Sequence, residues 1–183
     1  RTGLHMKKII RFAPLALAAA LSLGSVAVMA KSPAQWQAIV SQSKVSLDQA
    51  MEKAAQAVAG KVIDIELETG DGTAPRYEAD VVTPAGQRVV VWVNATTGDA
   101  AEHKQKGKAK SKDLKHMSDA KITIAQAVEA ALKSTSGTAI AAELDSNWGK
   151  ASYDVKVLQA DGTVMKVKID AVDSSVIRTK KDK

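Results

Sequence analysis

Residues 45–69 read VSLDQAMEKAAQAVAGKVIDIELET, and residues 122–146 read ITIAQAVEAALKSTSGTAIAAELDS. Each stretch begins with apolar residues spaced three and four apart and continues with apolar residues that alternate with other residues. The first pattern is typical of an amphipathic helix, and the second is typical of a strand with one buried face. The two stretches therefore predict the same helix-then-strand unit twice.

The similarity between the two stretches continues beyond them. It holds at an offset of 77 residues, which becomes 76 after a one-residue deletion in a turn. Sustained identity at glycine, tyrosine and capping positions indicates an internal duplication. Matching positions include Ala54 with Ala131, Gly60 with Gly137, Tyr77 with Tyr153, and Gly86 with Gly162.

Each predicted helix starts at a hydroxyl residue that is followed three positions later by a glutamine. Ser46 with Gln49, and Thr123 with Gln126, predict capping boxes, in which the hydroxyl and the amide each bind a backbone N–H group. A glycine follows the last apolar position of each helix. We expect Gly60 and Gly137 to end the helices in the left-handed conformation that glycine adopts easily.

Three short segments with alternating apolar residues follow each helix. Turn residues separate the segments, and short connections require antiparallel neighbours. The predicted fold class is α+β, with two tandem modules that each pack one helix on a three- to four-stranded antiparallel sheet. The predicted strands lie near residues 63–67, 77–82 and 89–93, then near 140–144, 153–157 and 165–169, with a short last strand at Val176-Ile177.

The predicted organisation has six parts. Residues 1–30 combine a tag remnant with a signal peptide, because a basic start at Met6-Lys7-Lys8 precedes an apolar run that suits cleavage after Ala30. In the N-terminal segment that follows, we expect Trp36 to pack on the core. The N-terminal segment spans 31–44, and the first module follows at 45–100. A solvated lysine-rich linker at 101–121, with a helical end expected near Leu114 and Met117, leads to the second module at 122–178 and a basic tail at 179–183.

The charge of the chain argues against nucleic acid as a partner. The chain of 183 residues has a formal net charge of +6, but four of its bases lie within residues 1–30, so that +2 remains without them. A charge of +2 is too small to indicate a nucleic-acid surface. The absence of cysteine excludes a disulfide framework. Nothing predicts stable membrane insertion once the signal peptide is removed.

The order of features in the first module resembles the PepSY domain. A capped helix and a glycine precede an acidic alternating strand, a tyrosine-bearing strand, a glycine turn and a β-branched strand that ends in Asn94-Ala95-Thr96-Thr97-Gly98-Asp99. The family usually has aspartate where this chain has Asn94. The second copy keeps that acid as Asp170, but it has Asp173-Ser174 in place of the Thr-Gly pair.

The resemblance implies a small cystatin-like module of the kind found in propeptides of secreted metallopeptidases and in bacterial envelope proteins. It also implies an inhibitory or chaperone-like action on peptidases, and it provides no catalytic residues. The tandem layout is similar in outline to the β-lactamase inhibitor protein.

No arrangement of residues in the sequence predicts catalysis, and we predict that the protein is not an enzyme. His103 and His116 lie in a lysine-rich segment that repels cations, so we expect them to be solvated rather than metal-bound. We predict no metal site and no cofactor. Acidic pairs such as Glu66 with Glu68 follow from strand alternation alone.

One strand differs between the copies in a way that indicates a binding surface. The third strand of the second module has Lys166 and Lys168 at its outward positions, where the first module has Val90 and Trp92. An exposed tryptophan within a polar rim is typical of a protein-binding hot spot. The alternative is that Trp92 is covered by the other module, by residues 31–44 or by the linker. The expected rim consists of Glu66, Glu68, Glu78, Asp80 and Arg88.

Trp148, in Asn147-Trp148-Gly149 at an expected hairpin tip, is a second candidate contact, and folding back onto its own sheet is the alternative. Together these features predict an exported, non-catalytic protein that binds a protein or peptide partner, such as a secreted or envelope peptidase. The alternative is a periplasmic small-ligand or cation sensor that uses the acidic sheet face of the first module. The expected location is periplasmic or secreted.

Overall fold

A computed structural model describes residues 31–69 and 74–182, in which two helices followed by four strands occur twice. The predicted signal peptide with its cleavage site, and the predicted turn at 70–72, lie outside these residues. The first repeat contains α1 (Pro33–Gln42), α2 (Leu47–Ala57), β1 (Lys61–Thr69), β2 (Pro75–Val82), β3 (Gln87–Asn94) and β4 (Ala100–Lys108). The second repeat contains α3 (Ser111–Asp119), α4 (Ile124–Ser134), β5 (Thr138–Asn147), β6 (Lys150–Leu158), β7 (Val164–Asp170) and β8 (Val176–Lys181).

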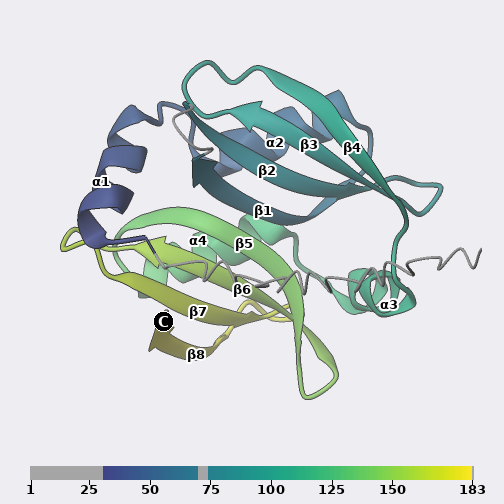
Figure 1. Cartoon of the computed structure of the whole chain (residues 1–183). Coiled ribbons are helices and arrows are strands. Elements are labelled where there is room, and N and C mark those ends of the chain that lie inside the picture. The colour runs from purple at the N-terminus through teal and green to yellow at the C-terminus, as the bar shows by residue number, and fades with distance from the viewer. Residues whose placement is uncertain (1–30, 70–73, 183) are drawn as a thin grey trace, which may run out of the picture.

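The strands form one continuous antiparallel sheet of eight strands, in the order β4-β3-β2-β1-β5-β6-β7-β8. Figure 1 shows α2 and α4 behind this sheet, so both helices cover the same face. Helix α2 packs on β1, β2 and β3, and α4 packs on β5, β6 and β7. The predicted α+β class with one covering helix in each module is confirmed, and the two sheets are joined edge to edge. No helix in the described part of the chain is long and apolar enough to cross a membrane.

The two repeats meet where β1 pairs with β5. Ile65 lies opposite Ala142, and Ala142 is the residue of the second repeat that corresponds to Ile65 at the offset of 77. On either side, Asp64 lies opposite Glu143 and Glu66 lies opposite Ala141. Because equivalent strands pair antiparallel around equivalent residues, an approximate two-fold axis passes between Ile65 and Ala142. This symmetry places α2 and α4 on one face and puts equivalent turns at opposite ends of the sheet.

Capping boxes start both helices that cover the sheet. Gln49 N donates to Ser46 Oγ at 3.2 Å, and Ser46 N donates to Gln49 Oε1 at 3.0 Å. Thr123 and Gln126 exchange the same two hydrogen bonds, at 3.2 and 2.8 Å. These bonds satisfy backbone N–H groups that the start of a helix leaves without partners. Both predicted capping boxes are confirmed.

A tyrosine on the second strand of each repeat fixes the chain just before the capped helix. Tyr77 Oη donates to the carbonyl oxygen of Val45 at 2.7 Å, and Tyr153 Oη donates to that of Ile122 at 3.0 Å. Burial raises the pKa of both phenols, to about 12 for Tyr77, so both keep the proton that they donate. The N–H groups of Val45 and Ile122 donate in turn to the loop after the third strand. Each helix start is thereby tied to two strands.

Gly60 and Gly137 do not cap the helices. The C-cap residues lie two positions earlier and have extended backbone, so the predicted left-handed helix endings are wrong. A Cβ atom at Gly60 would lie 2.5 Å from the carbonyl oxygen of Val82, and one at Gly137 would lie 2.3 Å from that of Leu158. Both glycines are needed because the first strand starts in close contact with the end of the second strand.

The predicted linker over 101–121 is wrong, because most of it has regular structure. Residues 100–108 form β4, an edge strand whose residues are almost all exposed. Residues 111–119 form α3, which has no buried residue. Helix α3 contains Leu114 and Met117, three residues apart, which agrees with the helical end expected there. Strand β4 has no apolar face, so it produces no alternation from which a strand is predicted. For the same reason the predicted basic tail is wrong at residues 179–181, which belong to the exposed edge strand β8.

Each repeat begins with a short helix that contacts a turn of the other repeat. Helix α1 packs on the core through the buried Trp36 and Ile39, as predicted for Trp36. It also reaches the turn between β6 and β7, where Gln37 Nε2 donates to the carbonyl oxygen of Ala160 at 3.2 Å. Helix α3 aligns with residues 34–42 at the offset of 77. The N–H of Ala109, just before α3, donates to a carbonyl in the turn between β2 and β3 at 2.9 Å.

One large apolar core lies between the sheet and the helices and includes residues of both repeats. Both repeats have a bulge at this place of their first strand, between Val62 and Asp64 in β1 and between Ala139 and Ala141 in β5. Ile140 nevertheless belongs to the large core and Ile63 does not, so the predicted burial pattern is wrong at Ile63. Ile63 belongs instead to a small second cluster. The second cluster consists of Ile63, Val82 and Ala109, with Met117 and Leu144 at its margin.

Gly60→Ala should destabilise the fold by about 1–3 kcal/mol, because the added methyl group would overlap the backbone of β2. Gly86→Ala is the matched control. Its backbone φ is +74° but no atom lies within 4 Å of the new Cβ, so it should cost only about 1 kcal/mol of backbone strain. Urea unfolding followed by circular dichroism measures both. Equal stability of Gly60→Ala and the unchanged protein would contradict the close approach.

Candidate functional site

The predicted patch on β3 is not an exposed apolar surface. Val90 is only 1% exposed, so its predicted exposure is wrong. In the sheet it lies between Asp80 on β2 and Lys104 on β4, and neighbouring side chains flank it on both sides. The sequence pattern treats β3 as an edge strand, because nothing in residues 101–108 indicates another strand. The presence of β4 removes Val90 from the residues that can contact a partner.

Trp92 is covered by its own module. Its indole N–H donates to Glu78 Oε2 at 3.2 Å. The ring stacks on His103 of β4 with 3.4 Å between ring centroids, and the guanidinium carbon of Arg76 on β2 lies 4.1 Å from the ring centroid. Because β2 and β4 flank β3 on opposite sides, the two groups cover opposite faces of the indole. Of the alternatives that the sequence leaves open, cover by residues 101–108 holds.

Three acidic residues of the expected rim, Glu66, Glu68 and Asp80, are paired with bases. Asp80 is buried and binds both Arg88 and Lys106, the latter with 3.1 Å between Lys106 Nζ and Asp80 Oδ1. The hydrogen bond from Arg88 to Asp80 raises the pKa of the guanidinium. Glu66 lies 3.5 Å from Lys156 of the other repeat, and Glu68 lies 3.8 Å from a guanidinium nitrogen of Arg76. Three of the four acids of the expected rim therefore have a basic partner within the molecule, and the fourth, Glu78, accepts from the indole of Trp92.

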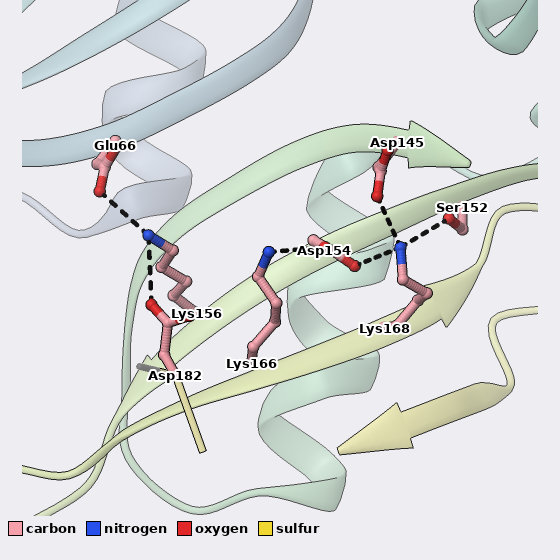
Figure 2. A network of polar contacts seen from close by, with 8 residues as sticks. All are labelled: Glu66, Asp145, Ser152, Asp154, Lys156, Lys166, Lys168 and Asp182. Carbon is pink, nitrogen blue, oxygen red and sulfur yellow. Dashed lines mark hydrogen bonds and ion pairs between the residues drawn. The ribbon is translucent and has the colours of Figure 1, made fainter. Parts of the chain in front are cut away.

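The equivalent region of the second repeat is a network of lysines and carboxylates on the sheet face opposite the helices (Figure 2). Lys168 is 6% exposed, so its predicted outward, solvated position is wrong. Its Nζ lies 2.8 Å from Asp154 Oδ1 and 2.7 Å from Asp145 Oδ2. Lys166 binds the other oxygen of Asp154 at 2.9 Å. A buried ammonium is tolerated here because two carboxylates share it.

These contacts explain why Trp92 and Lys168 can occupy equivalent positions. At the offset of 76, Trp92 aligns with Lys168 and Glu78 aligns with Asp154. In each repeat the residue on the third strand binds the acid on the second strand, through a hydrogen bond from Trp92 to Glu78 and through an ion pair between Lys168 and Asp154. The difference between the copies is therefore a change of side chain on the third strand within a local arrangement that both repeats share.

Two carboxylates face each other where the repeats join. Asp64 lies opposite Glu143 in the pairing of β1 with β5. Burial, followed by the charges of Glu143, Asp80 and Glu66, raises the pKa of Asp64 to about 7, although Arg88 opposes the shift. Burial also raises the pKa of Glu143, while Lys166 and Lys156 oppose the shift. No group of three or more acidic or histidine side chains in the described residues has the arrangement of a metal site.

Trp148 is the most exposed of the candidate residues. It is 97% exposed at the tip of the hairpin between β5 and β6, so it does not fold back onto its own sheet. Asn147 pairs with Lys150 around the two-residue turn. Trp148 has φ +51° and Gly149 has φ +81°, both in the left-handed region. The turn at the equivalent end of the first module lies outside the described residues.

A cleft between the repeats is the feature that sequence reasoning missed. It lies beside α2 and the start of α4, over β1, and has a volume of about 460 Å³. The signal that could have found it is the alignment of residues 111–119 with 34–42, which shows polar residues where α1 has apolar ones. Its apolar lining includes Met51, Ala55, Ile63, Met117, Ile124 and Leu144.

Asp64→Asn should stabilise the protein at about pH 8 by about 2 kcal/mol, because it removes a buried charge. The raised pKa means that the folded protein keeps the Asp64 proton up to about pH 7, whereas the unfolded chain loses it near 3.8. Folding stability therefore falls as the pH rises through that window, and the advantage of Asp64→Asn should shrink towards acid pH. Thermal unfolding across this pH range measures the effect. Glu52→Gln, on the exposed surface of α2, is the control, and an equal response of both variants would contradict the assignment.

Comparisons with known proteins agree with the duplicated fold. The family model of PepSY, described as "Peptidase propeptide and YPEB domain", matches residues 44–112 and 121–180, and the first match includes β4. No curated protein matches the chain. A solved structure of a "putative lipoprotein" from Clostridium difficile 630 is similar at 23% identity and a TM-score of 0.44, over 76% of this chain and 95% of that chain. The two family matches confirm the resemblance seen in the sequence: this chain belongs to the PepSY family and contains two PepSY domains in tandem.

Proposed function

We propose that this protein is an exported, non-catalytic binding protein whose partner is a protein or peptide, with Trp148 as the anchor of the contact. Because the family is described by its occurrence in peptidase propeptides, a secreted or envelope peptidase is the proposed partner class. The basic and then apolar pattern of residues 1–30 supports export, cleavage after Ala30 and a periplasmic or secreted location.

The exposure of Trp148 carries the proposal. An indole that is 97% exposed contributes little to the stability of the fold. Its left-handed backbone costs a non-glycine residue about 1 kcal/mol, and two-residue turns of this kind favour asparagine or glycine at this position. A tryptophan kept in water on a strained turn is accounted for by contact with another molecule, since tryptophan is enriched among binding hot spots.

The hairpin presents Trp148 from a firm base. Strands β5 and β6 pair up to Asn147 and Lys150. Below the tip, Asp145 is held by Lys168 at 2.7 Å. A preorganised contact loses less conformational entropy on binding than a mobile loop does.

The other candidate residues have a smaller part in the proposed contact. Val90 and Asp80 are buried, and the remaining side chains already bind groups within the molecule. These engaged residues are Glu66, Glu78, Arg88 and Trp92.

Trp148→Ala should weaken inhibition of a target peptidase by about tenfold or more, because a hot-spot indole contributes about 2 kcal/mol or more to binding. The assay uses a mature secreted metallopeptidase whose own propeptide contains a PepSY domain, with that propeptide removed, and measures the inhibition constant. Trp148→Phe should keep most of the inhibition, since it preserves a large aromatic side chain.

Val172→Ala is the matched control, because it removes an exposed apolar group from the neighbouring turn between β7 and β8. It should inhibit as well as the unchanged protein. If Trp148→Ala inhibits equally well, Trp148 is not the anchor. If the unchanged protein inhibits no such peptidase, the proposed partner class is wrong.

A further inference from the structure

We propose that the cleft between the two repeats is a binding site for a large apolar side chain, such as tryptophan, that lies next to a carboxylate in a partner polypeptide. This site is separate from Trp148, and it goes beyond the proposed function, because it receives a side chain and does not present one. The argument rests on the internal symmetry of the chain and on the charges at the edge of the cleft.

The equivalent region of the other repeat is packed with large apolar side chains. Helix α1 contributes Trp36 and Ile39, which are both buried in the large core. Helix α4 contributes Leu132, which packs against the same core. At the offset of 77, the corresponding residues are Asp113, His116 and Ala55, respectively. Ala55 lines the cleft, and the other two lie on α3, the helix that contributes Met117 to the lining.

The loss of these three apolar side chains divides the core. Ile140 and Leu158 of the second repeat belong to the large core, to which Trp36 and Ile39 also belong. Their equivalents in the first repeat, Ile63 and Val82, form the separate small cluster. The cleft is lined by Met51 and Ile124 of the large core and by Ile63 of the small one. The chemistry that fits it is therefore that of the missing groups, an indole or a branched aliphatic chain.

The edge of the cleft favours an anionic group beside that apolar side chain. Lys61 and Lys121 line it and are exposed. Among the described residues, neither ammonium lies within 4 Å of a carboxylate. Glu52 is the acid in the lining, so the two lysines leave a net positive charge. Asp119 lies near Lys121, but its carboxylate binds Lys115.

Two methionines allow the site to be observed directly. Met51 and Met117 line the cleft, whereas Met165 lies on β7 and does not. In protein labelled with ¹³C at the methionine methyl groups, N-acetyl-L-tryptophan is the probe, because it combines an indole with a carboxylate. The methyl signals of Met51 and Met117 should shift and saturate at millimolar probe, through the ring current of the bound indole, while that of Met165 stays in place.

Variants and a second probe separate the two parts of the proposal. Ala55→Leu gives α2 the residue that α4 has at the equivalent position, Leu132, and should abolish the shifts while the helix is kept. Lys121→Glu should weaken the affinity several-fold, and so should replacing the probe by N-acetyl-L-tryptophan amide, which lacks the carboxylate. Trp148→Ala should leave the titration unchanged, so the outcome is independent of the peptidase assay.

Three results would overturn the proposal. The first is the absence of shifts at Met51 and Met117 with millimolar probe, and the second is an unchanged titration in Ala55→Leu. The third is a shift of both methyl signals on raising the protein concentration without probe, lost in Trp148→Ala, because the occupant would then be the tryptophan of a second copy.

Discussion

The pairing of β1 with β5 is the contact on which the architecture depends, since it makes one sheet from two four-stranded meanders. Without it, each repeat would expose β1 or β5 as an unpaired edge with one apolar face. With it, the free edges are β4 and β8. Register shifts interrupt both outer pairings, and both edge strands are rich in basic residues, features that oppose further strand addition.

The same pairing sets the electrostatics of the junction. Glu143 is the equivalent of Glu66, and the two-fold axis places it opposite Asp64. On the other side of the axis, the same relation places Glu66 opposite the equivalent of Asp64. Identical repeats would bury two pairs of acids. In this chain the equivalent of Asp64 is Ala141, so Glu66 faces no second acid there. The charge of Glu66 is neutralised by Lys156 at 3.5 Å. The repeats thus form one repulsive contact where identical repeats would form two, and the carboxylates of this contact have raised pKa values.

The sequence predicts those parts of the fold in which a residue has a local partner or a buried face. The capping boxes and the repeated helix-and-strand order depend on spacings of a few residues, so they were correct. Strand β4 and the end of β8 have no buried stripe, so no period predicts them, and of α3 the sequence predicts only a helical end near Leu114 and Met117. Gly60 was assigned to the right boundary for the wrong reason, because the group that excludes a side chain there belongs to Val82, which is distant in sequence. The predicted exposure of Val90 and Trp92 assumed that β3 is an edge strand. Because β4 was not predicted, the candidate site was assigned too much exposed apolar surface.

The cleft, one of the two proposed contact sites, lies where the repeats differ. A shared feature such as the tyrosine that fixes each helix start serves the fold in both halves. The cleft exists only where α3 lacks the apolar residues of α1, and it is bordered by Leu144 and Tyr153 of the hairpin that ends in Trp148. Trp148 lies four positions after Leu144 in the hairpin, a distance of about 13 Å at the usual rise of a strand. A standard protein interface is wider than this distance. One partner could therefore receive the exposed indole and insert a side chain of its own into the cleft, which would make this end of the sheet a single binding face.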